Sequence, residues 1–114
     1  MKKTKMLKKN YEFKRVLTRG KYISGSYLEA FVKKNNKNFN NLGIAISVKS
    51  GKAVQRNRLK RLIRENYYLI EDKLTSGYSL VFLCKKKANI EKLDFFKIKK
   101  DMEIIVKKAG VFEE

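Results

Sequence analysis

The stretch KAVQRNRLKRLIRE at residues 52–65 holds the side chains best suited to binding chemistry. It contains six basic residues and a single acid, Glu65, which comes last. Arginine offers a planar fork of N–H donors that matches the oxygens of a phosphate, and lysine adds a compact positive charge. These residue types at this density predict the binding of phosphate groups rather than a chemical reaction.

A helix over residues 54–73 would divide this stretch into two sides, because successive residues of a helix are 100° apart. One arc is apolar, and we expect it to pack on a sheet, with Arg58 at its border. The members of this arc are Leu59, Leu62, Ile63, Asn66, Leu69 and Ile70. The opposite side carries Arg56, Asn57, Lys60, Arg61, Arg64 and Tyr68.

The charge pattern of the basic side differs from that of a face that is only solvated. Solvated faces usually mix signs, whereas Arg56, Lys60 and Arg64 are like charges four residues apart, which is mildly destabilising. The helix macrodipole also disfavours cations near the N-terminus. We therefore expect an external polyanion to supply the counter-charge.

The composition of the whole chain narrows the class of partner. The 114 residues include 29 Lys and Arg against 11 acids, which gives a net charge of +18. A field of that size attracts polyanions, so nucleic acid is the leading partner and an anionic membrane surface the second. No apolar run is long enough to span a membrane, and no apolar segment follows the basic N-terminus as it would in a secretory signal. The single Cys84 can form no internal disulfide, which fits a reducing cytoplasm.

Catalysis by this chain is disfavoured. The sequence has no histidine, which is the commonest general base. Its acids are scattered, and the adjacent Glu71 and Asp72 would point in different directions on a helix. We expect no catalytic residue, no small-molecule substrate, and no metal or cofactor held by side chains of this chain.

The remaining segments predict an α+β or open α/β sandwich built on one sheet. Asn10 is a plausible N-cap and Gly20 a plausible end of the first helix, and Asp94 is a plausible N-cap of the last. Gly25 and Ser26 predict a bend or a bulge within the stretch at 22–33. The expected elements are a helix at 11–19, strands within 22–33, a strand at 42–48, the basic helix at 54–73, a strand at 78–84 and a helix at 95–109.

A second surface could bind unpaired nucleotides. Phe13 on the first helix, and Phe31 and Ser47 on the strands, could share one side of a cleft. Aromatic rings surrounded by basic residues form a platform on which bases stack. The alternative is that these rings belong to the core. The basic residues expected near the cleft are Lys8, Lys9, Lys14 and Arg15.

The stretch at 52–65 also resembles the signature of the bacterial ribonuclease P protein subunit, because it fits the frame K-x-V-x-R-N-R-x-K-R-x-x-R-E. The similarity continues along the chain in the family's order. LKKNYEFKRVLTRGK at 7–21 resembles the family's first helix, and GIAISVKSGKAV at 43–54 resembles the strand and turn before the RNR helix. GYSLVFLCKKKAN at 77–89 resembles the strand that follows it.

This resemblance implies the fold αβββαβα, with one four-stranded mixed sheet and a left-handed βαβ crossover around the RNR helix. It implies a subunit of a ribozyme that cuts precursor tRNA endonucleolytically and so produces the mature 5′ end. The catalytic groups and their Mg²⁺ ions would belong to the RNA. The protein would bind ribonuclease P RNA through its basic helix and guide the single-stranded 5′ leader along a central cleft.

The resemblance also implies roles for individual positions. The residues expected to bind the RNA are Lys52, Arg56, Asn57, Arg58, Lys60, Arg61 and Arg64. Those expected to line the leader cleft are Phe13, Leu17, Phe31 and Ser47, with Lys8, Lys9, Lys14 and Arg15 in support. Leu17 stands where the family often has a second aromatic residue, Ala45 where some members have a serine, and Val48 where a lysine is common.

One alternative stays open at this point, namely a structural RNA-binding protein similar to ribosomal proteins. It would share the charge and the lack of catalytic residues, but the RNR frame and the aromatic cleft favour the ribonuclease P subunit. DNA binding is disfavoured, because the sequence shows no helix-turn-helix pair, zinc ligand set or heptad region. We expect residues 1–114 to form a single RNA-binding domain in the cytoplasm, away from membranes.

Overall fold

The computed structural model describes residues 4–113 and contains one mixed sheet of five strands. These strands are β1 (Thr4–Met6), β2 (Lys21–Ser24), β3 (Leu28–Lys34), β4 (Asn40–Ala45) and β5 (Tyr78–Cys84). They lie in the order β1-β4-β5-β3-β2. The β1/β4 and β4/β5 pairs are parallel, whereas β2/β3 and β3/β5 are antiparallel.

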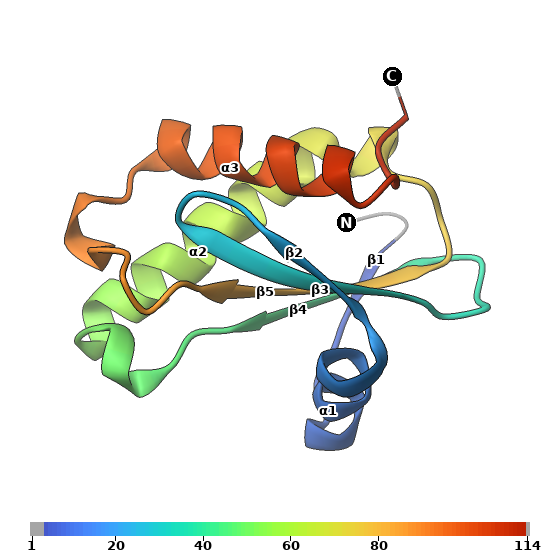
Figure 1. Cartoon of the computed structure of the whole chain (residues 1–114), viewed down its shortest axis with the longest axis horizontal. Coiled ribbons are helices and arrows are strands. Elements are labelled where there is room, and N and C mark those ends of the chain that lie inside the picture. The colour runs from blue at the N-terminus through green and yellow to red at the C-terminus, as the bar shows by residue number, and fades with distance from the viewer. Residues whose placement is uncertain (1–3, 114) are drawn as a thin grey trace.

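Three helices cover the two faces of this sheet (Figure 1). They are α1 (Asn10–Arg19), α2 (Ala53–Ile70) and α3 (Phe95–Lys108). The helices α2 and α3 lie together on one face, and α1 lies on the opposite face (Figure 1). The parallel strands β4 and β5 are neighbours joined through α2, as a βαβ crossover requires. The expected order αβββαβα is therefore confirmed, and β1 precedes it.

The expected count of four strands is wrong because of β1. This three-residue strand pairs with β4 in the register Thr4↔Asn40 to Met6↔Leu42, and the N–H of Leu7 extends the pairing to the carbonyl of Leu42. A strand this short and basic has no recognisable period-2 pattern of its own. The pairing depends on a partner more than thirty residues away, which local sequence does not reveal.

The ends of the helices match the predicted caps in part. Asp94 caps α3, since its Oδ1 accepts a hydrogen bond from the N–H of Lys97 at 2.8 Å. Asn10, by contrast, is the first residue of α1, and the N-cap is Lys9. The carboxylate of Glu12 accepts from the N–H of Lys9 at 3.0 Å, so an acid in the first turn replaces the capping side chain. The helix α2 ends at Ile70, and a 3₁₀ turn η2 (Glu71–Lys73) completes the expected range.

The apolar side of α2 packs against the sheet and α3 nearly as the periodicity predicts. Leu59, Leu62, Ile63, Asn66 and Ile70 are all buried. Leu69 is not, because 60% of it is exposed, and the fully buried Tyr67 packs into the core as well. The buried arc is rotated toward Tyr67 because β1 widens the sheet there, and the Tyr67 hydroxyl hydrogen-bonds to Thr4 Oγ1 at 2.8 Å.

The strand expected at 42–48 ends early, at Ala45. The chain then turns through the 3₁₀ helix η1 (Val48–Ser50), where Val48 is exposed instead of lying on the inner face of a strand. Ser47 begins this turn, since its side chain accepts a hydrogen bond from the N–H of Lys49 at 3.2 Å. The turn brings the start of α2 next to the end of the sheet.

The bend predicted at Gly25 is confirmed, and it is tied to α3 by one buried carboxylate. Asp101 is 1% exposed and accepts hydrogen bonds from the N–H groups of Ser26, Tyr27 and Leu28 at 2.5, 2.9 and 2.7 Å. A Cβ on Gly25 would lie 2.7 Å from both carboxylate oxygens, so this position has no room for a side chain. The hairpin of β2 and β3 is thereby held against α3.

Candidate nucleic-acid interface

The cations of α2 fall into three groups according to their partners, and Arg56 belongs to the first. Its Nη1 donates to the carbonyl of Gly51 at 2.7 Å and lies 3.4 Å from that of Val48. The helical period predicts that Arg56 faces outward without a partner. The structure corrects this, because part of its guanidinium holds the loop at residues 47–51 against the first turn of the helix.

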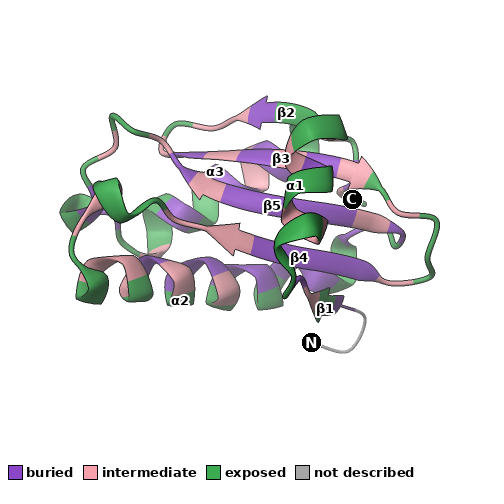
Figure 2. Cartoon of the chain, turned by 90° about the horizontal axis from the view of Figure 1, so that it is seen from below, coloured by how far each residue is buried: buried purple, intermediate pink, exposed green. Residues whose placement is uncertain are grey.

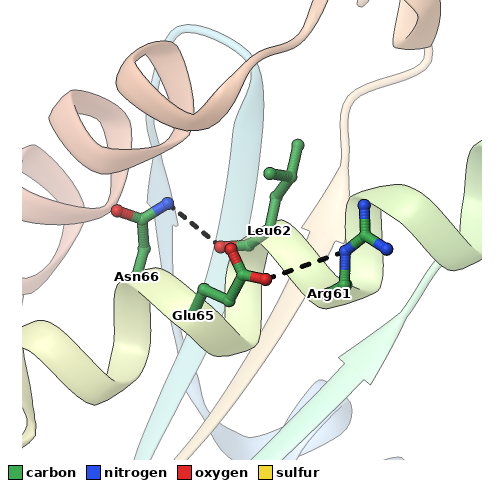
Figure 3. A network of polar contacts seen from close by, with 4 residues as sticks. All are labelled: Arg61, Leu62, Glu65 and Asn66. Atoms are coloured by element: carbon green, nitrogen blue, oxygen red, sulfur yellow. Dashed lines mark hydrogen bonds and ion pairs between the residues drawn. The ribbon is translucent and has the colours of Figure 1, made fainter.

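Arg61 forms the second group. Its Nε lies 3.7 Å from Oε1 of Glu65, one turn along the helix, and both side chains are largely exposed (Figure 3). An exposed pair at this spacing contributes about 0.3–0.5 kcal/mol. Figure 3 also shows Asn66 on the buried side, where its Nδ2 donates to the carbonyl of Leu62 at 3.0 Å. The one acid of the basic stretch therefore offsets one of its six cations.

The third group has no partner within the described chain. No hydrogen bond or ion pair joins the side chains of Arg58, Lys60 or Arg64 to any other residue among 4–113. All three are half-buried along their stems, which keeps their charged ends near the helix surface. Asn57 and Lys52 are exposed on the same stretch. Lys60 and Arg64 therefore form a stripe of unpaired cations on the outer side of α2, and Arg58 adds a third unpaired cation at the border of the buried side.

A second surface lies on the sheet face that α1 only partly covers (Figure 2). The helix rests on a small buried cluster of Leu7, Val16 and Val81. The partly buried residues packed against this cluster are Phe13, Leu17, Phe31, Ala45 and Leu83. The structure therefore brings Phe13, Leu17 and Phe31 together, as expected, at the boundary between a core and an open surface.

Phe13 is half-buried and packs closely against β4. A Cβ on Gly43 of β4 would lie 2.7 Å from Cε1 of the Phe13 ring. The ring thus lies directly on the backbone of β4, and only glycine at that position allows the approach. Phe13 supports the surface more than it offers a free ring face.

Tyr22 is a member of this surface that sequence analysis missed. It pairs with Phe31 across the β2/β3 hairpin, and the two ring centroids are 5.3 Å apart. Tyr22 is 51% exposed, and its hydroxyl donates to Oε2 of Glu29 at 2.6 Å. This hydrogen bond raises the pKa of Tyr22, so the hydroxyl keeps its proton at neutral pH. The predicted bend at Gly25 was a signal that could have placed Tyr22 opposite Phe31.

A pocket continues this surface toward the start of α2. Its lining residues are Glu29, Ala45, Ser47, Lys49, Ser50, Leu83, Cys84 and Lys86. Ser47, which was expected here, is joined by the exposed Lys49 and Lys86, which were not. Because residues 47–51 also carry the carbonyls bound by Arg56, the pocket and the basic helix adjoin at this loop.

The four supporting basic residues do not all lie near this pocket. Lys8, Lys9, Lys14 and Arg15 are exposed on α1 or just before it. Arg15 lines a separate pocket that also includes Glu12, Lys33 and Lys37. Glu12 and Arg15 lie on the side of α1 away from Phe13 and Leu17. The supporting role of the four basic residues stays a prediction.

The described residues include few other groups that could bind a metal ion or react with a substrate. No group of three or more Cys, Asp or Glu residues among 4–113 is arranged to hold a metal ion. Cys84 is buried, and burial raises the pKa of its thiol, which leaves it protonated and unreactive. No helix in the described part of the chain is long and apolar enough to cross a membrane.

Comparison with known proteins decides which family this geometry belongs to. The family model for ribonuclease P matches residues 1–110. The chain belongs to the ribonuclease P protein family. The ribonuclease P protein component of Clostridium kluyveri is 42% identical over 109 residues, which cover 94% of this chain and 96% of the relative. That of Clostridium botulinum strain Loch Maree is 42% identical over 111 residues, covering 96% and 98%.

Solved structures of ribonuclease P proteins have the same fold. The Staphylococcus aureus protein at 2.0 Å matches with a TM-score of 0.84 and 28% identity, covering 95% of this chain and 97% of that one. The Thermotoga maritima protein matches with a TM-score of 0.82 and 27% identity, covering 91% and 96%.

Membership in this family makes the chain a subunit of ribonuclease P, the holoenzyme that processes the 5′ ends of tRNA, with ribonuclease P RNA as its partner. The expected α+β fold class and the role as a subunit of ribonuclease P are confirmed. The ribosomal-protein-like alternative is set aside, because the family match covers nearly the whole chain.

Proposed function

We propose that the chain acts in the cytoplasm as a single RNA-binding domain with two adjoining surfaces. The first binds ribonuclease P RNA, and the second holds the 5′ leader of precursor tRNA while the RNA, with its own Mg²⁺ ions, performs the cleavage. The RNA-binding residues are Lys52, Arg56, Asn57, Arg58, Lys60, Arg61 and Arg64. The leader surface comprises Phe13, Leu17, Tyr22, Phe31 and Ser47.

The observation that carries the proposal is the set of unpaired cations on α2, in which Lys60 and Arg64 form an outward stripe and Arg58 lies at the border of the buried side. A folded protein normally pairs such charges or spreads them apart, because like charges four residues apart destabilise a helix. A phosphate backbone supplies many negative charges in a row, and binding it releases the counterions that surround it. The stripe fits a polyanion better than any single small anion.

The leader surface has the features of a site for unpaired nucleotides. Tyr22 and Phe31 offer rings at a sheet surface, and each base has a face that can stack on such a ring. Lys49 and Lys86 stand beside the pocket, where they would neutralise backbone phosphates. The stacked bases of double-stranded RNA could not reach these rings, so the surface favours single-stranded RNA.

Reconstitution of the holoenzyme tests whether the RNA or the protein performs the cleavage. We expect the purified chain with Mg²⁺ to leave precursor tRNA uncut, because residues 4–113 present no histidine and no metal-binding cluster. Adding ribonuclease P RNA should restore cleavage at the mature 5′ end, and the chain should raise the affinity of the holoenzyme for precursor tRNA but not for mature tRNA. Specific cleavage by protein freed of all RNA would contradict the assignment of chemistry to the RNA.

Phe31→Ala tests the leader surface. Because the ring is half-buried and can stack on one face only, we expect precursor tRNA to lose about 1 kcal/mol of binding free energy, the low end for one stacked base. Mature tRNA, which lacks the leader, should keep its affinity for the holoenzyme. The measurement is a pair of affinities, together with a thermal melt of the variant.

Phe96→Ala is the matched control, because Phe96 is 74% exposed on α3, outside the leader surface. It should leave both affinities unchanged. If Phe31→Ala lowers the melting temperature and weakens both tRNAs equally, Phe31 is a core residue without a leader contact.

A further inference from the structure

Glu29 is the unexpected side chain of the leader surface. It lies on β3 two residues before Phe31, so the two side chains share a face of the sheet. The chain has a net charge of +18, yet this carboxylate lines the same pocket as the exposed Lys49 and Lys86. Because a carboxylate repels phosphates, any contact that it makes with a nucleotide would be with a hydrogen-bond donor on the base.

The carboxylate is held in place and faces an accessible space. Oε2 of Glu29 accepts the Tyr22 hydroxyl at 2.6 Å, which uses one of the four lone-pair positions of the carboxylate. Glu29 also lines the pocket formed with Ala45, Leu83 and Lys86. A base stacked on Tyr22 or Phe31 would direct its edge toward this pocket, where Glu29 still has acceptor positions free.

The chemistry of a carboxylate selects among the four bases. An ionised carboxylate only accepts hydrogen bonds, and it accepts two parallel N–H groups best. On their Watson–Crick edges, adenine and cytosine place an acceptor nitrogen next to their amino group, and uracil flanks its N3–H with two carbonyls. Guanine alone presents two neighbouring donors, N1–H and the N2 amino group.

We propose that Glu29, positioned by Tyr22, recognises an unpaired guanine in the 5′ leader through two hydrogen bonds to N1–H and N2–H. This specificity rests on the proposed binding of the leader to the Tyr22 and Phe31 surface. The base would lie over the rings, and Lys86 and Lys49 would contact the phosphates on either side of it. Glu29 would then set the sequence preference, while the rings set the affinity.

The test is a set of precursor tRNAs in which each of the leader nucleotides nearest the cleavage site is changed in turn to all four bases. With wild-type holoenzyme, guanine at one position should bind about tenfold more tightly than the other bases, within the range of a bidentate base contact. Glu29→Gln should abolish that preference, because its amide presents one acceptor and one donor and no longer matches two donors. Binding of the other leaders should change by less than twofold.

Asp72→Asn is the matched control, since it removes one exposed negative charge beyond the far end of α2. It should keep the guanine preference, which separates recognition by Glu29 from the general gain of positive charge. Thermal melts of both variants complete the comparison.

The outcomes distinguish this inference from the proposed function. If wild-type holoenzyme binds precursor more tightly than mature tRNA but shows no guanine preference at any leader position, Glu29 only braces Tyr22 and the inference is wrong. The inference is also wrong if the guanine preference survives Glu29→Gln. If wild-type holoenzyme binds precursor and mature tRNA equally well, the proposed function of the leader surface is wrong.

Discussion

Asp101→Ala is expected to lower the free energy of unfolding by about 3 kcal/mol, because it leaves three backbone N–H donors without their acceptor. These donors belong to Ser26, Tyr27 and Leu28 in the β2/β3 bend. Alanine also removes the carboxylate that connects this bend to α3. For a chain whose total stability is about 5–15 kcal/mol, this is a large fraction.

Denaturant unfolding of Asp101→Ala beside Asp94→Ala provides the measurement. Asp94 caps the same helix with one hydrogen bond, to the N–H of Lys97, whose loss should cost about 1 kcal/mol. Asp101→Asn keeps one acceptor oxygen and should fall between the two. If Asp101→Ala costs no more than Asp94→Ala, the buried carboxylate is not the main attachment of the hairpin.

The Asp101 contact also bears on the proposed function, because the hairpin carries the proposed leader surface. Tyr22 lies on β2, and Glu29 and Phe31 lie on β3, on either side of the bend that Asp101 holds. The register Tyr22↔Phe31 keeps the two rings 5.3 Å apart. A loosened bend would separate the rings from the pocket at the end of β4, although no residue of the proposed leader surface had changed.

Replacing Lys60 and Arg64 together with alanine is expected to weaken binding of the chain to ribonuclease P RNA by about 30-fold near physiological salt, the effect of two lost phosphate contacts. The slope of log affinity against log salt concentration should fall by about one to two units for the same reason. The fold should not suffer, because both residues lack partners within 4–113 and alanine is the best helix former. The melting temperature should stay the same or rise, since a repulsive pair is removed.

Lys99→Ala/Lys100→Ala is the matched control, because it removes two exposed cations from α3. It should reduce RNA affinity by much less than the α2 variant and leave the salt slope nearly unchanged. Equal losses for the two variants would mean that net charge, and not the stripe on α2, attracts the RNA. Arg56 is a poor choice for such a test, since its replacement would also release the loop at 47–51.

Local patterns in the sequence determined most of the elements and the direction of the basic face. The 3.6-residue period placed Leu59, Leu62 and Ile63 on the buried side of α2, and the density of arginine and lysine on the other side indicated phosphate binding. The Asp94 cap and the bend at Gly25 were also readable, because each depends on residues only a few positions apart. The family resemblance supplied the order of the elements and the function.

Only the tertiary structure decided which of the residues in these patterns are buried, which are paired within the protein and which are free to bind. Leu69 has the right period, but the sheet does not extend beneath it, whereas β1 extends it beneath Tyr67. Arg56 has the right charge, but the turn at 47–51 folds back onto its guanidinium. The pairing of Tyr22 with Glu29, and their closeness to the pocket, follow from strand register and from strands distant in sequence. The physical reason is the same in each case: propensity and periodicity act over one or two turns, whereas burial, pairing and partner choice depend on whatever the fold places opposite each side chain.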